Sequence, residues 1–193
     1  MSKAGFWFEG GRISLDCIAT NGARCGELLP APESLAAWLV AARLSEQQLE
    51  VSAAELAETH ALRAALLRLV QASMGSGGVR PGDVDIINAA AGQEAPLQLL
   101  NLRDGDLVGR EPAPHVRQCL GVIARDAIDL LIGPHRLLLR RCAADNCSGI
   151  YVDLSRGGRR KWCTAAGCGN RARVSAHRSQ RHTASPPETE GGE

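Results

Sequence analysis

Aromatic side chains are scarce in this sequence of 193 residues, where Phe, Trp and Tyr together make up only 3%. Proteins that bind single-stranded nucleic acids stack the bases on such rings, so the chain has few platforms for that mode of binding. Long apolar runs are also missing, since no segment approaches the roughly 20 apolar residues of a membrane-spanning helix. The start of the chain, MSKAGFWFEGGR, lacks the apolar region of a secretory signal. We therefore expect a cytoplasmic protein without a membrane partner.

The motifs of common enzyme classes are absent as well. The sequence contains no phosphate-binding loop, no nucleophile elbow, no H-E-x-x-H helix and no concentrated set of histidines and carboxylates. The acidic run Asp104-Gly105-Asp106 is typical of a turn. We therefore predict no catalytic residues and no enzymatic activity.

Charge is distributed unevenly along the chain, although the formal net charge is only +1. Residues 1–135 carry 11 basic and 16 acidic side chains, whereas residues 136–187 carry 11 basic and 2 acidic ones. A basic module attached to a neutral or acidic body is the usual electrostatic signature of polyanion binding. We predict a body over residues 1–135, a basic module over 136–182, and a disordered tail over the polar residues 183–193.

Apolar periodicity and turn signals predict a mixed α+β (α/β) body. An aromatic strand at residues 6–8 and a glycine turn lead into an apolar segment that ends at Asn21-Gly22. A hairpin around Asp104-Gly105 is predicted over residues 97–111. The predicted helices cover residues 33–44, the stretch from the capping box Ser52-Ala-Ala-Glu55 to Gly75, residues 83–91 and residues 115–133.

Seven cysteines are an odd number, and in a reducing cytosol they favour metal or redox chemistry over disulfide bonds. Four of them form two C-x4-C pairs, namely Cys142, Cys147, Cys163 and Cys168. Between the pairs, a β-like run at 149–153 and a turn at 155–158 predict a hairpin that carries the second pair back to the first. Four thiolates then surround one structural zinc ion and leave no open position for a substrate.

Basic residues surround the second cysteine pair. Residues 169–182 have good helix formers and no proline, so they predict a basic helix that begins near Cys168. The residues predicted to contact DNA are Arg159, Arg160, Lys161, Asn170, Arg171, Arg173, Arg178 and Arg181. Phosphates are the expected targets, with Asn170 and Arg171 as candidates for base edges. Asn170 is also suited to capping this helix, and Trp162 to packing over the zinc site.

The segment RRCAADNCSGIYVDLSRGGRRKWCTAAGCGNRARVSAHR resembles the CGNR zinc finger. The shared features are the four cysteines, the D-x-S-R element Asp153 to Arg156, the pair Trp162-Cys163 and the run Cys168-Gly169-Asn170-Arg171. In that family the finger follows an α/β N-terminal domain, the ABATE domain, whose early motif is similar to LDCIAT at residues 15–20. Here Cys17 and Ala19 stand in place of the Phe and Asn of L-D-F-V-N-T.

This resemblance implies zinc binding and a role in stress-induced transcription regulation, with an N-terminal domain that senses a small molecule or a stress signal. Three functions are compatible with the sequence. The first is a bacterial-type regulator whose zinc module binds DNA and whose body binds an effector or forms a homodimer. The second is a module that binds a protein or RNA, because a basic face also suits an acidic partner. The third is a redox switch, in which oxidation of the zinc thiolates releases the metal.

Overall fold

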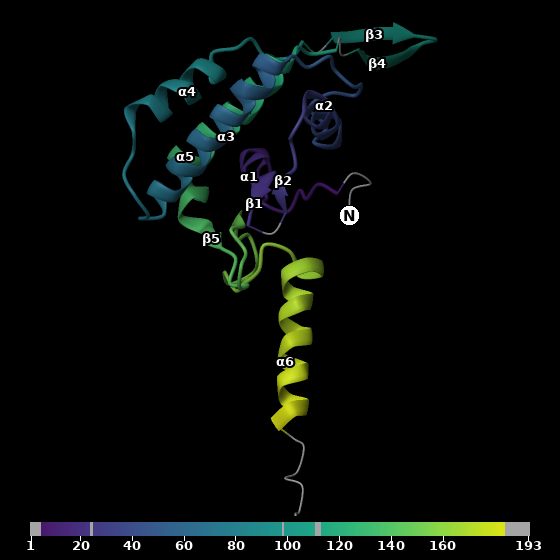
Figure 1. Ribbon diagram of the computed structural model, residues 1–193. Helices are drawn as coiled ribbons and strands as arrows, with labels where there is room; N and C mark the ends of the chain where they lie inside the picture. Colours follow the sequence, from purple (N-terminus) through teal and green to yellow (C-terminus); the bar gives the residue numbers. More distant parts are fainter. Residues whose placement is uncertain (1–4, 24, 98, 111–112, 184–193) are drawn as a thin grey trace, which may run out of the picture.

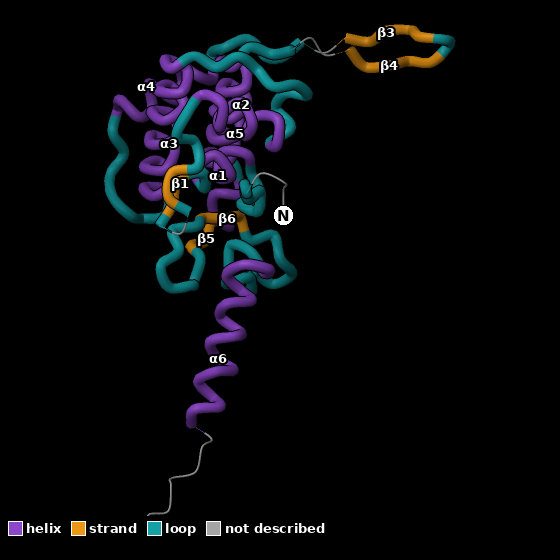
Figure 2. Tube along the Cα trace, turned by 45° about the vertical axis from the view of Figure 1, so that its right-hand side comes forward, coloured by secondary structure: helices purple, strands orange, loops and turns teal. Residues whose placement is uncertain are grey.

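The computed structural model describes residues 5–23, 25–97, 99–110 and 113–183, and the side chains at 109, 110, 177 and 179–183 fall outside that description. It consists of a helical body, a projecting β-hairpin, a small module at the base of the body and a projecting C-terminal helix (Figures 1 and 2). The predicted α+β class is confirmed. From residue 184 onward, the predicted tail lies outside the described residues.

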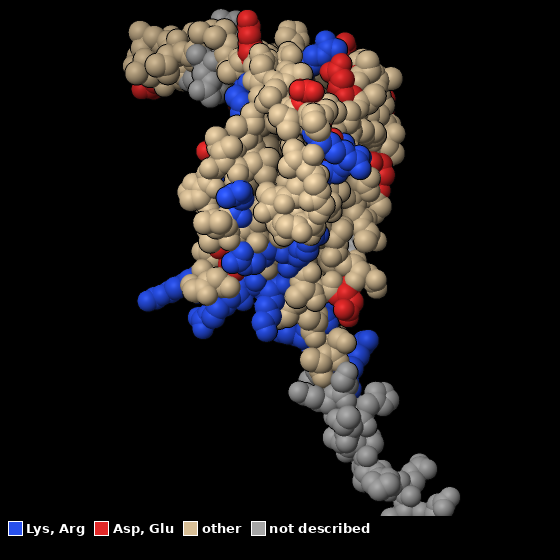
Figure 3. All heavy atoms as spheres, turned by 90° about the vertical axis from the view of Figure 1, so that its left-hand side faces the viewer, with Lys and Arg blue, Asp and Glu red and all other residues tan. Residues whose placement is uncertain are grey.

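The body is formed by helices that pack around one apolar core. These helices are α1 (Ile13–Ile18), α2 (Pro32–Ala41), α3 (Ala53–Ser73), α4 (Pro81–Ala91) and α5 (Val116–Ile132). Helix α3 packs against both α4 and α5, while α1 packs against α3 and α5. Figure 3 shows Lys and Arg side chains gathered at the lower end of this body, where the cysteine-containing module lies. In the described part of the chain, no helix combines the length and apolar character needed to cross a membrane.

Local sequence signals set the start of some helices, and tertiary contacts set others. At α3 the predicted capping box forms, because the Ser52 hydroxyl accepts the Glu55 N–H at 3.2 Å and the Glu55 carboxylate accepts the Ser52 N–H at 2.8 Å. Helix α1 has no side-chain cap of its own. Instead, Asp126 on α5 accepts the N–H of Ser14 at 3.0 Å, which ties the start of α1 to α5.

The aromatic strand predicted at residues 6–8 is wrong, since these residues form no strand in the structure. Phe6 is buried in the core, and Phe8 stacks on Trp38 of α2 with ring centroids 6.1 Å apart. The aromatic side chains at positions 6 and 8 are therefore used in packing against the helical body. Asn21-Gly22, predicted to end the apolar segment, forms the short strand β1, which pairs with β2 (Gly26–Glu27).

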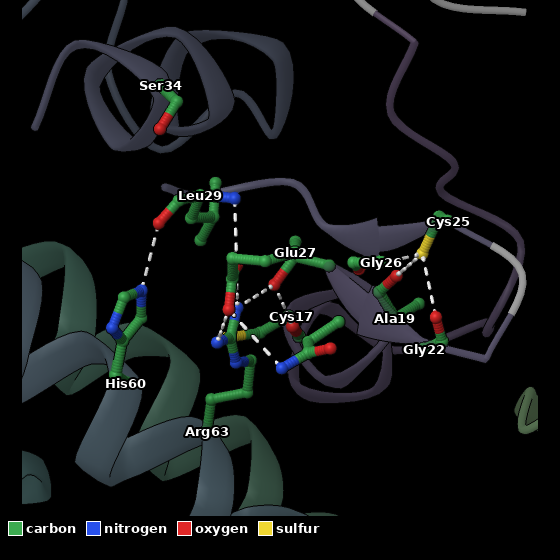
Figure 4. Close-up of polar contacts among 12 residues, drawn as sticks. Cys17, Ala19, Gly22, Cys25, Gly26, Glu27, Leu29, Ser34, His60 and Arg63 are labelled. Atoms are coloured by element: carbon green, nitrogen blue, oxygen red, sulfur yellow. Dashed lines mark hydrogen bonds and ion pairs between the residues drawn. The ribbon is translucent and has the colours of Figure 1, made fainter. Parts of the chain in front are cut away.

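A buried arginine fastens the β1–β2 hairpin to α3 (Figure 4). The Arg63 guanidinium donates to Thr20 Oγ1 at 2.9 Å and to Glu27 Oε1 at 2.7 Å, and it forms an ion pair with the same carboxylate. One turn earlier on α3, the His60 ring contacts the Leu29 carbonyl at 2.9 Å. These bonds hold the segment between α1 and α2 against the centre of the body.

Strands β3 (Leu99–Arg103) and β4 (Asp106–Arg110) form the predicted hairpin, which projects away from the helices (Figure 1). Asp104 and Gly105 have φ values of 53° and 90°. Positive φ at both central residues is what a two-residue type I′ turn requires. The Asp-Gly pair therefore determines where this hairpin reverses.

One face of the β3–β4 hairpin is apolar and open to solvent. In the ladder, Leu102 lies opposite Leu107, and Leu100 lies opposite Gly109, so the three leucines share one face. Leu100, Leu102 and Leu107 are 75%, 72% and 73% exposed. We call these three side chains the leucine face.

The hairpin of the C-terminal module differs from the predicted one. Strand β6 (Ile150–Val152) pairs with β5 (Leu139–Arg141), which precedes it, and not with the chain that follows. The first cysteine pair therefore lies at the loop end of this hairpin. Leu139, Ile150 and Val152 are part of the core of the body, because the hairpin turns its apolar side chains inward. The module beyond residue 135 is thus anchored in the same core as the helices.

Candidate metal centre

Four cysteine sulfurs converge at the base of the body. The Sγ atoms of Cys142, Cys147, Cys163 and Cys168 all lie within 4.8 Å of one another. Cys163 Sγ lies 3.7 Å from Cys147 Sγ and 3.6 Å from Cys168 Sγ. The Sγ atoms of Cys147 and Cys168 are 3.6 Å apart. In a tetrahedral zinc site with Zn–S bonds of about 2.3 Å, neighbouring sulfurs are about 3.8 Å apart. The cluster therefore has the dimensions of a four-cysteine zinc site.

The first cysteine pair is shaped by the loop between β5 and β6. The Cys142 N–H donates to the Gly149 carbonyl at 2.9 Å, and Asn146 turns the chain with a φ of 56°. The Gly149 N–H donates to Cys147 Sγ at 3.4 Å. A Cβ at position 149 would lie only 3.0 Å from Cys163 Sγ, closer than side chains normally approach. Gly149 was not predicted from the sequence, because its requirement arises only when the two cysteine pairs meet.

The second cysteine pair leads into the C-terminal helix. A π-helical turn over Ala165–Gly169 continues directly into α6 (Asn170–Thr183). The Thr164 hydroxyl caps this turn by accepting the Gly167 N–H at 3.4 Å. Asn170 has helical dihedrals, with φ −66° and ψ −44°. It therefore lies within the helical path, and Thr164 has the capping role that the sequence suggested for Asn170.

Trp162 packs beside the metal centre, as predicted. Its indole ring lies against Gly169, where an added Cβ would be 3.4 Å from Trp162 Cε3. Gly169 directly follows the ligand Cys168. The ring therefore covers the turn that carries the fourth sulfur.

Burial and neighbouring groups shift the ionisation of three thiols in the cluster, Cys147, Cys163 and Cys168. Although burial opposes a charged sulfur, the Gly149 N–H and the neighbouring thiols lower the pKa of Cys147 to about 7. Burial and the nearby charge of Cys147 raise the pKa of Cys163, and burial also raises that of Cys168. Cys147 therefore forms a thiolate readily, whereas Cys163 and Cys168 resist ionisation, and a bound divalent cation would hold these sulfurs as thiolates. The donor set fits zinc in chemistry as well as in size.

The D-x-S-R element organises the loop between the two cysteine pairs. The buried Asp153 carboxylate accepts the hydroxyl and the N–H of Ser155 at 2.6 and 2.9 Å, and the N–H of Arg160 at 3.2 Å. The hydrogen bond from the Ser155 hydroxyl lowers the pKa of the Asp153 carboxyl, and the hydrogen bonds from the N–H groups of Ser155 and Arg160 lower it further. Gly157 and Gly158 complete the turn with φ values of 81° and 61°. This loop is therefore held by its own hydrogen bonds.

Arg160 has a role that its position in a basic run did not reveal. Its guanidinium donates to the carbonyls of Trp162 at 2.9 Å, Glu9 at 2.8 Å and Cys163, and it lies 4.2 Å from the centre of the Tyr151 ring. These contacts tie the second cysteine pair to the N-terminal segment of the body. Because its donors are occupied by these backbone carbonyls, we propose no DNA contact for Arg160.

The other residues predicted to contact DNA lie at the surface around the start of α6. Those with described, exposed side chains are Arg159, Lys161, Asn170, Arg171, Arg173 and Arg178. Arg171 also donates to Cys168 Sγ at 3.3 Å, so it contacts the metal centre directly. The side chain of Arg181 lies outside the described part of the structure.

The fold and the cysteine cluster define a zinc-finger protein, in which a four-cysteine finger is docked on a helical body. A CGNR zinc finger model matches residues 138–181, and the ABATE model, described as "Putative stress-induced transcription regulator", matches residues 11–134. Because the second match covers more than half of the sequence, the chain belongs to the ABATE family. A search of curated proteins finds no match to the chain. The predicted cofactor, one structural zinc ion, is confirmed by the finger family and the cluster geometry.

Proposed function

We propose that the protein is a bacterial transcription regulator that binds DNA through the basic residues around α6. The observation that supports this is the isolation of α6. Among the described elements, it packs closely only with the π-helical turn before it, and it projects into solvent (Figure 1). The helix contains arginines and no acidic residue. A lone helix of this length is marginally stable in water, and DNA phosphates would offset its charge.

In this proposal the metal centre directs the helix. Zinc holds the four thiolates together, and Cys168 lies in the turn that opens α6, so the cluster sets the direction in which the helix leaves the body. Arg173 and Arg178 on the helix, with Arg159 and Lys161 at its base, supply phosphate contacts. Four sulfur ligands leave no position for a substrate, so we propose no enzymatic activity. A reducing bacterial cytoplasm keeps such thiolates available.

DNA binding is tested by fluorescence anisotropy with zinc-loaded protein at two salt concentrations. We expect tighter binding to the duplex upstream of its own gene than to a scrambled duplex, and a steep loss of affinity with salt. Replacing Arg173 and Arg178 with glutamine should reduce the salt slope by about 2, since each lost phosphate contact removes about 1.

The matched control for that test is Arg103→Gln, which removes an exposed arginine from the β3–β4 hairpin and should leave the slope unchanged. Failure to bind either duplex would contradict the proposal. Binding of RNA or of an acidic protein under the same conditions would then identify the finger as an interaction module.

We also propose that a second copy of the chain covers the leucine face. An isolated two-stranded hairpin is marginally stable in water, so this projecting hairpin needs a partner. The leucine face carries no charge, and two copies related by a two-fold axis can therefore stack the same apolar surface without like-charge repulsion. A dimer would also present two basic helices to DNA.

Sedimentation velocity tests this assembly. We expect wild-type protein to sediment as a dimer at micromolar concentration and Leu102→Lys to sediment as a folded monomer. Val79→Lys, at a residue that is 63% exposed on another part of the body, is the control and should remain dimeric. A wild-type monomer at these concentrations, or a Leu102→Lys dimer, would contradict the proposal.

A further inference from the structure

A cavity of about 120 Å³ lies where the helical body meets the zinc finger. Leu15 and Ile18 of α1 and Leu67 of α3 line it from the body. Residues 147–150 line it from the finger, together with Cys163. The lining is mainly apolar, and it belongs to both parts of the protein. A ligand held here would touch the body and the finger at once.

One buried carboxylate in this cavity has no charge partner among the residues that the structure describes. Asp16 is only 7% exposed, and its Oδ1 accepts the Gly10 N–H at 2.8 Å. None of the ion pairs among the described residues includes Asp16. Burial raises the pKa of its carboxyl to about 6, so at pH 7 the group is mostly charged and poorly solvated. Buried charges in proteins are normally paired, and a ligand can supply the missing partner.

We propose that this cavity binds a small organic cation, with its ammonium group on the Asp16 carboxylate and a short alkyl body among the apolar walls. The charge of the lining favours a cation. Glu9 and the zinc-bound thiolates of Cys147 and Cys163 also line the cavity, and Arg141 is the basic residue in its lining. A dry engineered cavity of about 150 Å³ takes up benzene, so this smaller one suits about five non-hydrogen atoms.

Because the cavity lies beside the zinc ligands, ligand binding here should affect how readily zinc is released. Residues 147–150 hold one zinc ligand, and Gly149 lies between two of the sulfurs. A bound cation would hold this loop against α1 and slow the opening that releases zinc. Any effect on DNA binding rests on the proposed function, whereas ligand binding and zinc retention are measured without DNA.

The test uses isothermal titration calorimetry on the zinc-loaded full-length protein at pH 7.5, with n-butylammonium, n-butanol and butyrate as probes. We expect n-butylammonium to bind at least tenfold more tightly than n-butanol, and butyrate to show no binding. Asp16→Asn retains an acceptor for the Gly10 N–H and should reduce the ammonium affinity to that of the alcohol. Asp85→Asn removes an exposed carboxylate from α4 and should change nothing.

Zinc transfer to a chromogenic chelator provides a second readout. Saturating n-butylammonium should slow zinc loss several-fold in wild-type protein and have no effect in Asp16→Asn. Equal affinity for the ammonium and the alcohol overturns the proposal, and so does full ammonium affinity in Asp16→Asn. If Asp16→Asn does not fold, comparing the affinities of the three probes for wild-type protein still tests whether the cavity prefers a cation. A protein that binds the cation but no DNA would retain this site and lose only the proposed function.

Discussion

Replacing Cys163 with serine is expected to remove zinc, unfold the loop and helix after β6, and abolish DNA binding. A structural zinc ion contributes about 10–16 kcal/mol to the folding of small finger peptides. The described chain after residue 153 has little apolar packing that could replace this contribution. Among the described elements, α6 packs closely only with the turn that carries Cys168. Losing one of four ligands therefore removes the support of the whole segment.

The helical body should survive this substitution. Leu139 and Val152 remain buried in the core of the body, so the β5–β6 hairpin keeps its anchor without zinc. Hydrogen-exchange mass spectrometry should show lost protection after residue 153 and native protection in α3 and α5. Cys25→Ser, which removes a thiol outside the cluster, is the control and should bind one zinc ion. A Cys163→Ser protein that kept zinc and DNA affinity would refute the assigned role of the cluster.

Replacing Arg63 with alanine is expected to lower the free energy of unfolding by about 1–3 kcal/mol, because it removes a buried guanidinium and its hydrogen bonds to Thr20 and Glu27. The Arg63 side chain is 8% exposed and that of Glu27 is 32% exposed. Urea denaturation monitored by circular dichroism measures the loss. Arg117→Ala breaks the exposed pair with Glu58 and should cost less than about 1 kcal/mol.

The contribution of Arg63 to the free energy of unfolding should also depend on pH. Although burial opposes its charge, the bond from Arg63 lowers the pKa of Glu27 below its usual value. The pair therefore stabilises the fold fully above the ordinary glutamate pKa of about 4.3, and its contribution disappears as pH falls through the lowered folded value. The difference between wild type and Arg63→Ala should be constant from pH 6 to 8 and shrink at acid pH. A difference that grew on acidification would contradict this assignment.

Signals that lie within a few residues of one another were sufficient to predict much of this protein. The capping box at Ser52 starts a helix, and Asp104-Gly105 reverses a hairpin, because each motif satisfies its own backbone. The two C-x4-C pairs likewise indicate one zinc ion, because that spacing lets each pair contribute two thiolates to one tetrahedron. The division of charge at residue 135 likewise indicates a basic C-terminal part, because net charge does not depend on the fold.

Only the tertiary structure decided the features that join distant segments. Arg160 contacts the Glu9 carbonyl across most of the sequence, a contact that its place in a basic run does not reveal. Gly149 is required because sulfurs from both pairs crowd it. Asp16 is buried beside the finger, where it forms no ion pair with any described residue. A linear pattern records which groups are present, whereas the pairing and burial of each group depend on what the fold brings next to it.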